Sequence, residues 1–195
     1  MSDDERSPLR ERLVDAGVEL VLAEGSGAVG LREIARRAGV SHGAPRRYFA
    51  THRELLSAVA RRGFEELAAR FAAVREPDPR ARLACLARAY LAYAAERRGM
   101  FELMFRHDLL NGDGSAPAGP RLREATVPLF GELARLVARC TGDERRAPVA
   151  TAALWANLHG LAQLRGWGST ALMLGEGREE ELLEAVLAAH LGAAE

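Results

Sequence analysis

Apolar residues recur every three or four positions along most of the chain, and no stretch keeps the apolar–polar alternation that is typical of a β-strand. Leu9, Leu13, Ala16 and Leu20 show this helical spacing in the first segment. Turn residues divide the pattern into about nine predicted helices. They span 9–23, 31–38, 41–49, 52–75, 79–97, 100–106, 120–140, 148–164 and 178–191. The predicted fold class is therefore all-α.

Several residues have the chemistry of helix ends. Gly39 follows the second helix where a C-terminal glycine is expected, and Ser41 is the predicted N-cap of the third. Thr51 and Glu54 form a predicted capping box for the fourth helix, and Asp78 is the predicted N-cap of the fifth. We expect a loop at 107–119, which includes the sequence NGDGSAPAG, and a glycine-broken segment at 166–177.

Residues 31–56 have the pattern of a helix-turn-helix. Two short predicted helices meet through the tight glycine turn of 38–41. Ala35 is small enough for the helices to approach closely. We expect Ile34, Ala38, Val40 and Phe49 to form the buried side of this unit, which leaves the start of its second helix exposed.

The exposed side of this motif carries the residue types that contact DNA. Small residues at the helix start let the backbone approach the duplex, and an alanine there can touch a thymine methyl group. Arginine, histidine and tyrosine side chains bind bases or phosphates, as do a serine hydroxyl and helix-start amides. The predicted DNA-binding residues are Arg32, Ser41, His42, Gly43, Ala44, Arg46, Arg47, Tyr48 and His52.

The charge distribution supports this prediction. The 195 residues carry 27 basic and 27 acidic side chains, for a formal net charge of zero, and every basic one is arginine. Residues 31–62 hold eight arginines and two glutamates, so this segment is strongly positive and the remainder is correspondingly negative. The lack of lysine excludes Schiff-base and P-loop lysine chemistry but not phosphate binding.

Signals for other classes of function are missing from the sequence. The chain has no apolar leader near residue 1, no apolar run of membrane-spanning length, and no cofactor, metal or nucleophile motif. Cys85 and Cys140 lack metal-site spacing and are expected to be reduced thiols. We therefore predict a cytoplasmic protein that is not an enzyme, has no cofactor or metal, and does not contact a membrane.

Over about residues 9–60 the sequence resembles the TetR family of bacterial transcriptional repressors. The matching positions are Gly25, Ile34-Ala35, the turn 38–41, Gly43, Phe49 and Leu55-Leu56. Three positions depart from the family pattern. Gly30 replaces a capping threonine or serine, Arg46 replaces a tyrosine, and His52 replaces a lysine that commonly contacts phosphate.

The C-terminal half contains Trp155, His159 and Gly160 in the spacing Trp-x-x-x-His-Gly, which looks like the signature of one TetR C-terminal subgroup. Trp155 and His159 share a helical face, and they either pack as core or line an effector cavity. The resemblance implies a small effector, and an apolar cavity would suit a hydrophobic or aromatic one. The predicted ligand-binding residues are Phe64, Tyr90, Met104, Phe105, Trp155 and His159.

The predicted organisation has three parts. These are a flexible N-terminal arm at 1–8, a three-helix DNA-binding domain at 9–56, and a helical effector-binding and dimerisation domain at 57–195. The resemblance implies a homodimer through the last two helices, bound to a pseudopalindromic double-stranded operator. The alternatives are a small-molecule-binding regulator without sequence-specific DNA binding and, least favoured, an enzyme.

Overall fold

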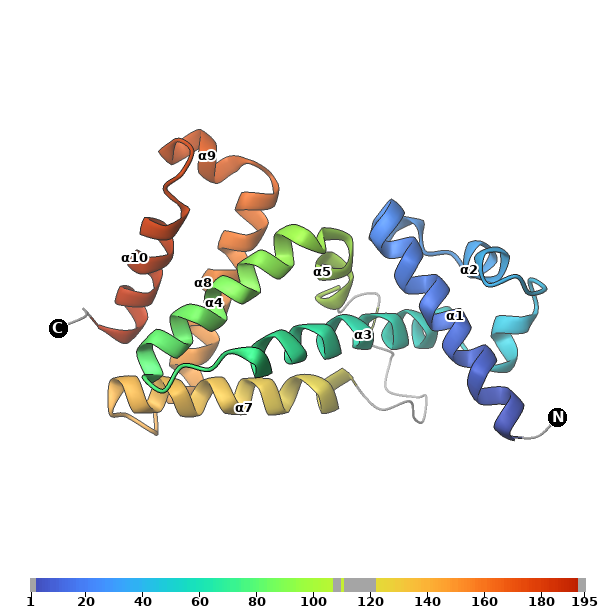
Figure 1. The fold of residues 1–195 in the computed structure, drawn as a ribbon, viewed down its shortest axis with the longest axis horizontal. Helices are drawn as coiled ribbons and strands as arrows, with labels where there is room; N and C mark the ends of the chain where they lie inside the picture. The colour runs from blue at the N-terminus through green and yellow to red at the C-terminus, as the bar shows by residue number, and fades with distance from the viewer. Residues whose placement is uncertain (1–2, 107–109, 111–121, 193–195) are drawn as a thin grey trace. The chain divides into compact units, whose positions relative to one another are not determined.

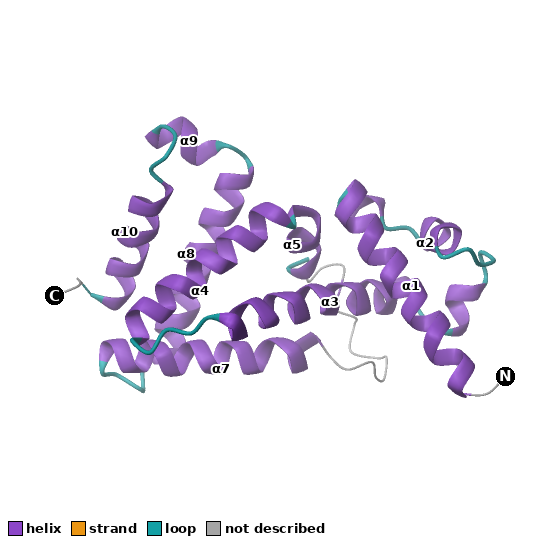
Figure 2. Ribbon diagram, in the orientation of Figure 1, coloured by secondary structure: helices purple, strands orange, loops and turns teal. Residues whose placement is uncertain are grey.

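The computed structural model describes residues 3–106, 110 and 122–192, and every regular element among them is helical (Figures 1 and 2). This confirms the all-α prediction. The α-helices are α1 (Asp3–Glu24), α2 (Leu31–Arg37), α3 (His52–Ala73), α4 (Pro79–Glu96), α5 (Arg98–Met104), α7 (Leu122–Thr141), α8 (Ala147–Gly166), α9 (Ser169–Leu174) and α10 (Glu179–Leu191), with the short 3₁₀ helices η1 (Ser26–Ala28) and η2 (Ala44–Arg47).

Packing divides the chain into two compact units that are not continuous in sequence. Unit 1 comprises Met1–Glu66 and Arg97–Ala125, and unit 2 comprises Leu67–Glu96 and Thr126–Glu195. The helix α5 therefore packs with the N-terminal residues, although it lies far along the chain. This boundary describes packing, so the division into functional domains at residue 56 stays a prediction.

The core of unit 1 forms where α1 packs against α2, η1 and α5. Leu13, Leu20, Ile34 and Val59 are fully buried there, as the helical spacing of apolar residues predicts. Gly17 lets α1 and α3 approach closely, because a Cβ at this position would lie 2.5 Å from a methyl group of Val59.

Helix α5 is fixed to unit 1 by two glycines. A Cβ on Gly99 would lie 2.4 Å from the carbonyl oxygen of Val21 and 3.1 Å from the Cα of Gly25. On α3, a Cβ on Gly63 would lie within 3 Å of the side chains of Met100 and Met104. At Gly99 the backbone of Val21 and Gly25 occupies the space that a larger residue would need, and at Gly63 the methionine side chains of α5 occupy it.

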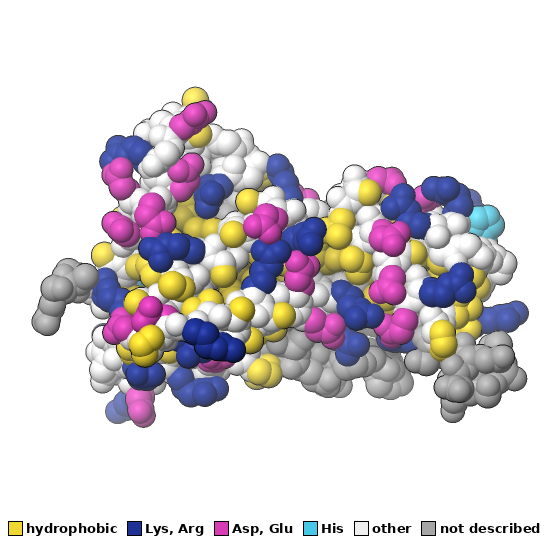
Figure 3. All heavy atoms as spheres, in the orientation of Figure 1, with side chains coloured by type: hydrophobic (Ala, Val, Ile, Leu, Met, Phe, Trp, Pro, Cys, Tyr) yellow, Lys and Arg dark blue, Asp and Glu magenta, His cyan; other side chains and the backbone are white. Residues whose placement is uncertain are grey.

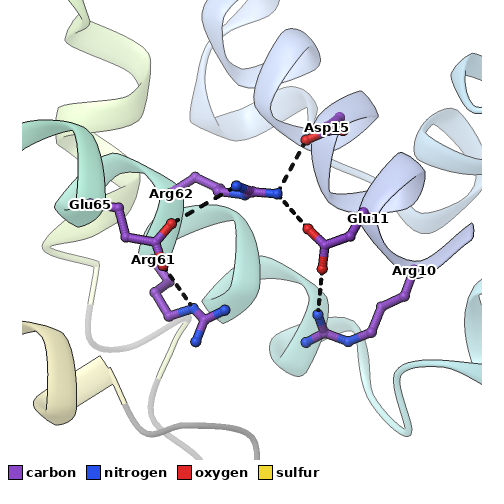
Figure 4. A network of polar contacts seen from close by, with 6 residues as sticks. All are labelled: Arg10, Glu11, Asp15, Arg61, Arg62 and Glu65. Carbon is purple, nitrogen blue, oxygen red and sulfur yellow. Dashed lines mark hydrogen bonds and ion pairs between the residues drawn. The ribbon is translucent and has the colours of Figure 1, made fainter. Parts of the chain in front are cut away.

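An ion-pair network joins α1 to α3 within unit 1 (Figure 4). Arg62 pairs with Glu11 and lies 3.6 Å from Asp15, while Glu65 pairs with Arg61 at 3.5 Å. These side chains are partly exposed, so each pair contributes at most about 1 kcal/mol to stability. The main effect of the network is to neutralise Arg61 and Arg62.

The core of unit 2 forms where α8 packs against α4, α9 and α10. Leu83, Tyr93 and Leu183 are among its most buried side chains. Arg88 of α4 bonds Glu180 of α10, and this hydrogen bond raises the pKa of the Arg88 guanidinium and lowers that of the Glu180 carboxyl.

Three of the predicted helix ends are confirmed. The amide of Glu54 donates to the Thr51 hydroxyl at 3.1 Å, as predicted for the cap, while the Glu54 carboxylate accepts from the amide of Ala50 at 2.7 Å, one residue before the N-cap amide that a capping box uses. The amide of Ala81 donates to the Asp78 carboxylate at 2.7 Å. Gly39 follows α2 with φ +67.

Other boundaries differ from the predictions. Helix α1 begins at Asp3 rather than Leu9, so Pro8 lies inside it. Pro8 has no amide to bond the carbonyl four residues earlier, so the first part of α1 lacks one helical hydrogen bond. Within the segment 166–177, which was predicted to be broken by glycines, the chain forms the short helix α9. Gly168 and Gly175 lie at its two ends, with φ angles of 74° and 80°. Apart from Leu110, the predicted loop 107–119 lies outside the described residues.

Candidate functional site

The turn between α2 and η2 is built as the glycine pattern predicts. The amide of Gly39 donates to the Arg36 carbonyl, and the amide of Val40 donates to the Ala35 carbonyl, at 3.2 and 3.0 Å. This is the Schellman arrangement, which needs the positive φ of a glycine. Arg12 of α1 donates from Nη2 to the Ala38 carbonyl at 2.7 Å, so the first helix holds the turn in place.

The predicted third helix is much shorter than expected. The 41–49 helix is replaced by the single 3₁₀ turn η2, whose N-cap residue is Gly43 rather than Ser41. Pro45 explains the difference, because it has no amide to donate to the Ser41 carbonyl; the Ala44 amide binds that carbonyl at 2.9 Å instead. Pro45 itself is buried, which fixes the following residues to the core.

Four of the eight arginines in the basic segment are paired with carboxylates. On α2, Arg36 donates from Nε to Glu33 at 2.9 Å, and this hydrogen bond lowers the pKa of the Glu33 carboxyl. Arg37 pairs with Glu24 at 3.0 Å. With Arg61 and Arg62 already in the α1–α3 network, half of the positive charge is matched inside unit 1.

The other four arginines form what we call the open arginine set: Arg32, Arg46, Arg47 and Arg53. All four are exposed, and within the described part of the chain none has a carboxylate at ion-pair distance. Figure 3 shows basic and histidine side chains at the surface around α2 and the following turn. Cations without an internal partner are the ones that can neutralise an external anion.

The remaining predicted DNA-binding residues lie around the open arginine set. Ser41, His42 and Gly43 are exposed in the turn, while Ala44 and Tyr48 are half-buried. His52 is exposed at the start of α3, and its Nε2 lies 2.6 Å from the Val29 carbonyl. A carbonyl only accepts, so this hydrogen bond requires the proton on Nε2 of His52, and that nitrogen is then used within the protein.

The predicted ligand-binding residues separate between the two units. In unit 1, Phe64 is buried and the half-buried Phe105 contacts it edge-on at 5.5 Å between ring centroids. Phe101 packs on Phe105 at 5.1 Å, and Met104 is fully buried beside Gly63. These residues form an aromatic core that holds α5 to α3.

In unit 2, Tyr90, Trp155 and His159 come together in what we call the α4–α8 cluster. The hydroxyl of Tyr90 lies 2.8 Å from Nδ1 of His159, and the rings of Trp155 and His159 are 5.5 Å apart. Phe130 of α7 packs edge-on against Trp155 at 5.4 Å. Tyr90 is buried, whereas Trp155 and His159 are half-buried.

Burial sets the protonation of the α4–α8 cluster. It lowers the pKa of His159 and so favours the neutral imidazole. It raises the pKa of Tyr90 strongly, and a hydrogen bond from Trp155 opposes this only in part, so the phenol keeps its proton. The polar groups of Tyr90 and His159 are therefore uncharged, and they lie beside the aromatic ring of Trp155.

An open groove of about 650 Å³ lies between the end of α7 and the start of α8. None of the predicted ligand-binding residues contributes to its walls. It is lined by Ala134, Arg135, Ala138, Arg139, Gly142, Glu144, Ala147 and Pro148. It therefore does not correspond to the effector cavity expected from the sequence.

An apolar stripe runs along the outer face of α8. Its members repeat at steps of three or four residues, and the side chains at its ends are large while those at its centre are small. Val149 is 75% exposed, Trp167 65% and Leu164 39%. The α8 stripe consists of Val149, Ala153, Ala156, Gly160, Leu164 and Trp167. A neighbouring contact joins α8 to α10, where Asn157 lies 3.2 Å from His190.

Sequence reasoning missed several residues that the structure brings to these places. Arg53 belongs to the open arginine set, and its position beside the capping box was an available signal. The sequence has no such signal for Arg12, Phe130 or Gln163. Arg12 and Phe130 contact residues that are distant in sequence, and Gln163 lies outside any motif.

Within the described ranges, every helix is too short or too polar to span a lipid bilayer. Those same ranges hold no group of three or more histidine, cysteine and acidic side chains placed to bind a metal ion.

Comparison with protein families gives two matches. Residues 13–59 match the family described as bacterial regulatory proteins, tetR family, and residues 83–190 match the tetracyclin repressor-like C-terminal domain. The second match spans more than half of the chain and includes the α4–α8 cluster. No curated protein matches the sequence.

Solved structures with a similar fold cover nearly the whole chain. A protein of unknown function from Rhodococcus sp. RHA1 is 30% identical, with 94% of this chain and 93% of that chain covered and a TM-score of 0.72. A transcriptional regulator from the same organism is 25% identical, with 95% and 99% covered and a TM-score of 0.67. RolR in complex with the ligand resorcinol is 21% identical, with 97% and 89% covered and a TM-score of 0.67.

Proposed function

Because the chain belongs to the TetR family of bacterial transcriptional regulators, we propose that it is a dimeric repressor that a small effector releases from its operator. The family makes it a DNA-binding regulator and not an enzyme. The operator, the effector and the effect of the effector on DNA binding are parts of the proposal. Because operator DNA lies in the bacterial cytoplasm, we also propose that the protein is cytoplasmic.

The observation that carries the proposal is the open arginine set. Half of the arginines in the basic segment are matched by carboxylates, whereas Arg46 and Arg47 on η2 are exposed without an ion-pair partner in the described chain. An arginine presents a planar fork of donors that fits a phosphate or a guanine edge. We expect η2 to enter the major groove, with Arg32 and Arg53 on flanking phosphates.

Dimerisation is supported by the α8 stripe. An exposed apolar row with small residues at its centre suits a close crossing with the same helix of a second copy around a two-fold axis. Helix α10 also has exposed alanines, which are Ala185, Ala188 and Ala189. Two reading units would then bind operator half-sites about 34 Å apart.

The effector is proposed to bind at the α4–α8 cluster. Aromatic side chains from three helices meet there, and its polar atoms are neutral. This composition suits a small, largely apolar or aromatic molecule with a polar substituent. The similar fold of RolR, solved with resorcinol, is in line with a ligand of this size.

The proposal is tested by selecting DNA fragments that bind the full chain and measuring the affinity of the selected operator across salt concentrations. A specific dimer binds a pseudopalindrome, and its affinity falls with salt at a slope that corresponds to several phosphate contacts. Binding that is equally weak for all sequences would instead support the alternative regulator without sequence-specific DNA binding.

Replacing Gly160 by leucine tests the α8 stripe. A side chain at Gly160 meets nothing within 4 Å in the single chain, and glycine is a poor helix former. We therefore expect Gly160→Leu to leave the folded protomer intact and to weaken the dimer at least tenfold, as measured by sedimentation equilibrium. Gly131→Leu on α7, also without neighbours within 4 Å, is the control. Equal dimer affinities for both variants would contradict this interface.

A further inference from the structure

Helix α9 leaves its large apolar side chains in solvent. Its one buried residue is Thr170, whereas Leu172 is 89% exposed, Met173 71% and Leu174 39%. A run of exposed large apolar residues commonly marks a site of interaction with another protein surface. The acidic side chain of Glu176 follows them, and it is exposed without an ion-pair partner in the described chain.

The opposite end of α8 has a groove with matching properties. This is the open groove between α7 and α8, which we call the α7–α8 groove. Its charged lining residues are Arg135, Arg139 and Glu144, so its net charge is positive. Neither arginine has a carboxylate at ion-pair distance within the part of the chain that the structure describes. An apolar segment that carries an acidic residue complements this groove. The apolar lining residues are Ala134, Ala138, Ala147 and Pro148.

A protomer cannot bring its own α9 to its own groove. The groove lies at the start of α8, and α9 follows the end of the same helix (Figure 1). A helix of 20 residues is about 30 Å long, so the length of α8 separates the two surfaces. An α9 that fills the groove therefore belongs to a second copy of the chain.

The composition of α8 indicates how the second copy is placed. No acidic residue and no arginine lies between Arg146 and Arg165, and a helix without charges on any face is normally covered on all sides. In the single chain the α8 stripe is left uncovered. A parallel pair of α8 helices would bring Arg146 of both copies together and align the two helix dipoles. An antiparallel pair around a two-fold axis avoids both contacts.

The α8 stripe also sets the register of this antiparallel pair. Its small residues lie at the centre and its large residues at the ends, which fits two helices that cross closely at the middle and diverge towards both ends. With the axis at the centre of the stripe, Ala156 faces the partner's Gly160. In the same register Pro148, which lines the α7–α8 groove, faces the partner's Gly168, the residue directly before α9. The two-fold axis therefore brings α9 of each copy to the groove of the other.

We propose that α9 of each protomer docks in the α7–α8 groove of its partner and forms a second contact of the dimer. Leu172 and Met173 cover the apolar lining of the groove, and Glu176 lies beside its two arginines. A standard interface buries about 800 Å² per partner, and a row of small side chains along one helix is narrow, so a stable dimer needs further contact at both ends. The inference rests on the proposed pairing of the α8 stripe.

Photo-crosslinking from position 172 tests the contact directly. Leu172 is replaced by p-benzoylphenylalanine in the full chain, which is mixed with the ¹⁵N-labelled unaltered chain before irradiation. Because Leu172 is 89% exposed, the replacement leaves the protomer intact. We expect mass spectrometry to find the crosslink in residues 134–148 of the labelled chain. Crosslinks confined to the unlabelled chain, crosslinks to other helices, or none in a sample that sediments as a dimer would overturn the inference.

An exchange of charge tests the same contact through the affinity of the dimer. Leu172→Arg removes the apolar contact and places a cation beside the two groove arginines at both ends of the dimer, so we expect its dissociation constant to rise about a hundredfold. Adding Arg139→Glu should restore about tenfold of this loss, because the new arginine then meets a carboxylate. Val127→Arg on α7, 57% exposed and outside the groove, is the matched control and should have less than about a twofold effect. Unaltered dimer affinity in Leu172→Arg, or no rescue by Arg139→Glu, would rule out the docking.

Sedimentation equilibrium separates this inference from the proposed function. If Gly160→Leu weakens the dimer and Leu172→Arg does not, the α8 stripe pairs but α9 lies elsewhere, and only this inference fails. If the unaltered chain is monomeric at every concentration, the proposed dimer fails and this contact fails with it. Weakening by both variants, together with rescue by Arg139→Glu, supports both.

Discussion

Replacement of Gly99 by alanine is expected to destabilise unit 1 by about 2–3 kcal/mol. The added Cβ would lie 2.4 Å from the Val21 carbonyl oxygen and 3.1 Å from the Cα of Gly25. Both are backbone atoms, which cannot move aside as a flexible side chain does. The start of α5 must then separate from the end of α1, and the urea midpoint of unfolding should fall by roughly 1 M.

A second glycine provides the control for this prediction. Gly131 lies within α7 and has no atom within 4 Å of the site where a Cβ would be placed. Gly131→Ala should therefore be neutral or stabilise the protein by up to about 1 kcal/mol, since alanine is the better helix former. Equal stabilities of Gly99→Ala and Gly131→Ala would mean that α5 does not pack against α1 as described.

The double substitution Arg46→Ala with Arg47→Ala is expected to reduce operator affinity at least about a hundredfold. Both arginines are exposed on η2, and in the described chain neither has an ion-pair partner to lose. The unfolding midpoint should stay within experimental error for the same reason. Fluorescence anisotropy with the selected operator measures the affinity, and the slope against salt should become shallower as phosphate contacts are lost.

Arg36→Ala is the matched control for the arginine prediction. Arg36 is an exposed arginine of α2 in the same basic segment, but it bonds Glu33. Its removal changes the net charge by one unit without removing a member of the open arginine set. We expect less than a fivefold change in affinity. A loss as large as that of the double variant would mean that general charge, and not η2, determines binding.

Much of the helical framework could be predicted because the signals are local. The contacts of Thr51 and Glu54, the Asp78 cap and the turn at Gly39 each depend on residues within five positions of one another. The buried face of α1 follows from apolar spacing alone. Helical hydrogen bonds have the same short range, so an all-α chain shows more of its fold in its sequence than a sheet protein would.

The elements that were missed are those where one residue outweighs the pattern around it. Pro45 shortens the predicted 41–49 helix to η2 because it removes a single amide. Gly168 and Gly175 bound a short helix in a segment that composition alone marks as broken. In α1, the helix passes through Pro8, where sequence rules favour a start.

The candidate sites were only half visible in the sequence. The basic segment indicated nucleic acid, but its eight arginines look alike until Glu24, Glu33, Glu11 and Glu65 are seen beside four of them. The Trp-x-x-x-His-Gly spacing indicated a shared helical face. It could not indicate Tyr90, whose hydroxyl comes from another helix and lies 2.8 Å from Nδ1 of His159.

The two tryptophans lie in different environments and can serve as intrinsic fluorescence probes. Trp155 is half-buried in the hydrogen-bonded α4–α8 cluster, while Trp167 is largely exposed at the end of the α8 stripe. Their emission spectra should therefore differ, with Trp167 emitting at longer wavelength and more accessible to a dissolved quencher such as iodide. Intrinsic fluorescence thus separates into one component that senses the interior of unit 2 and another that senses its outer surface, with no label attached.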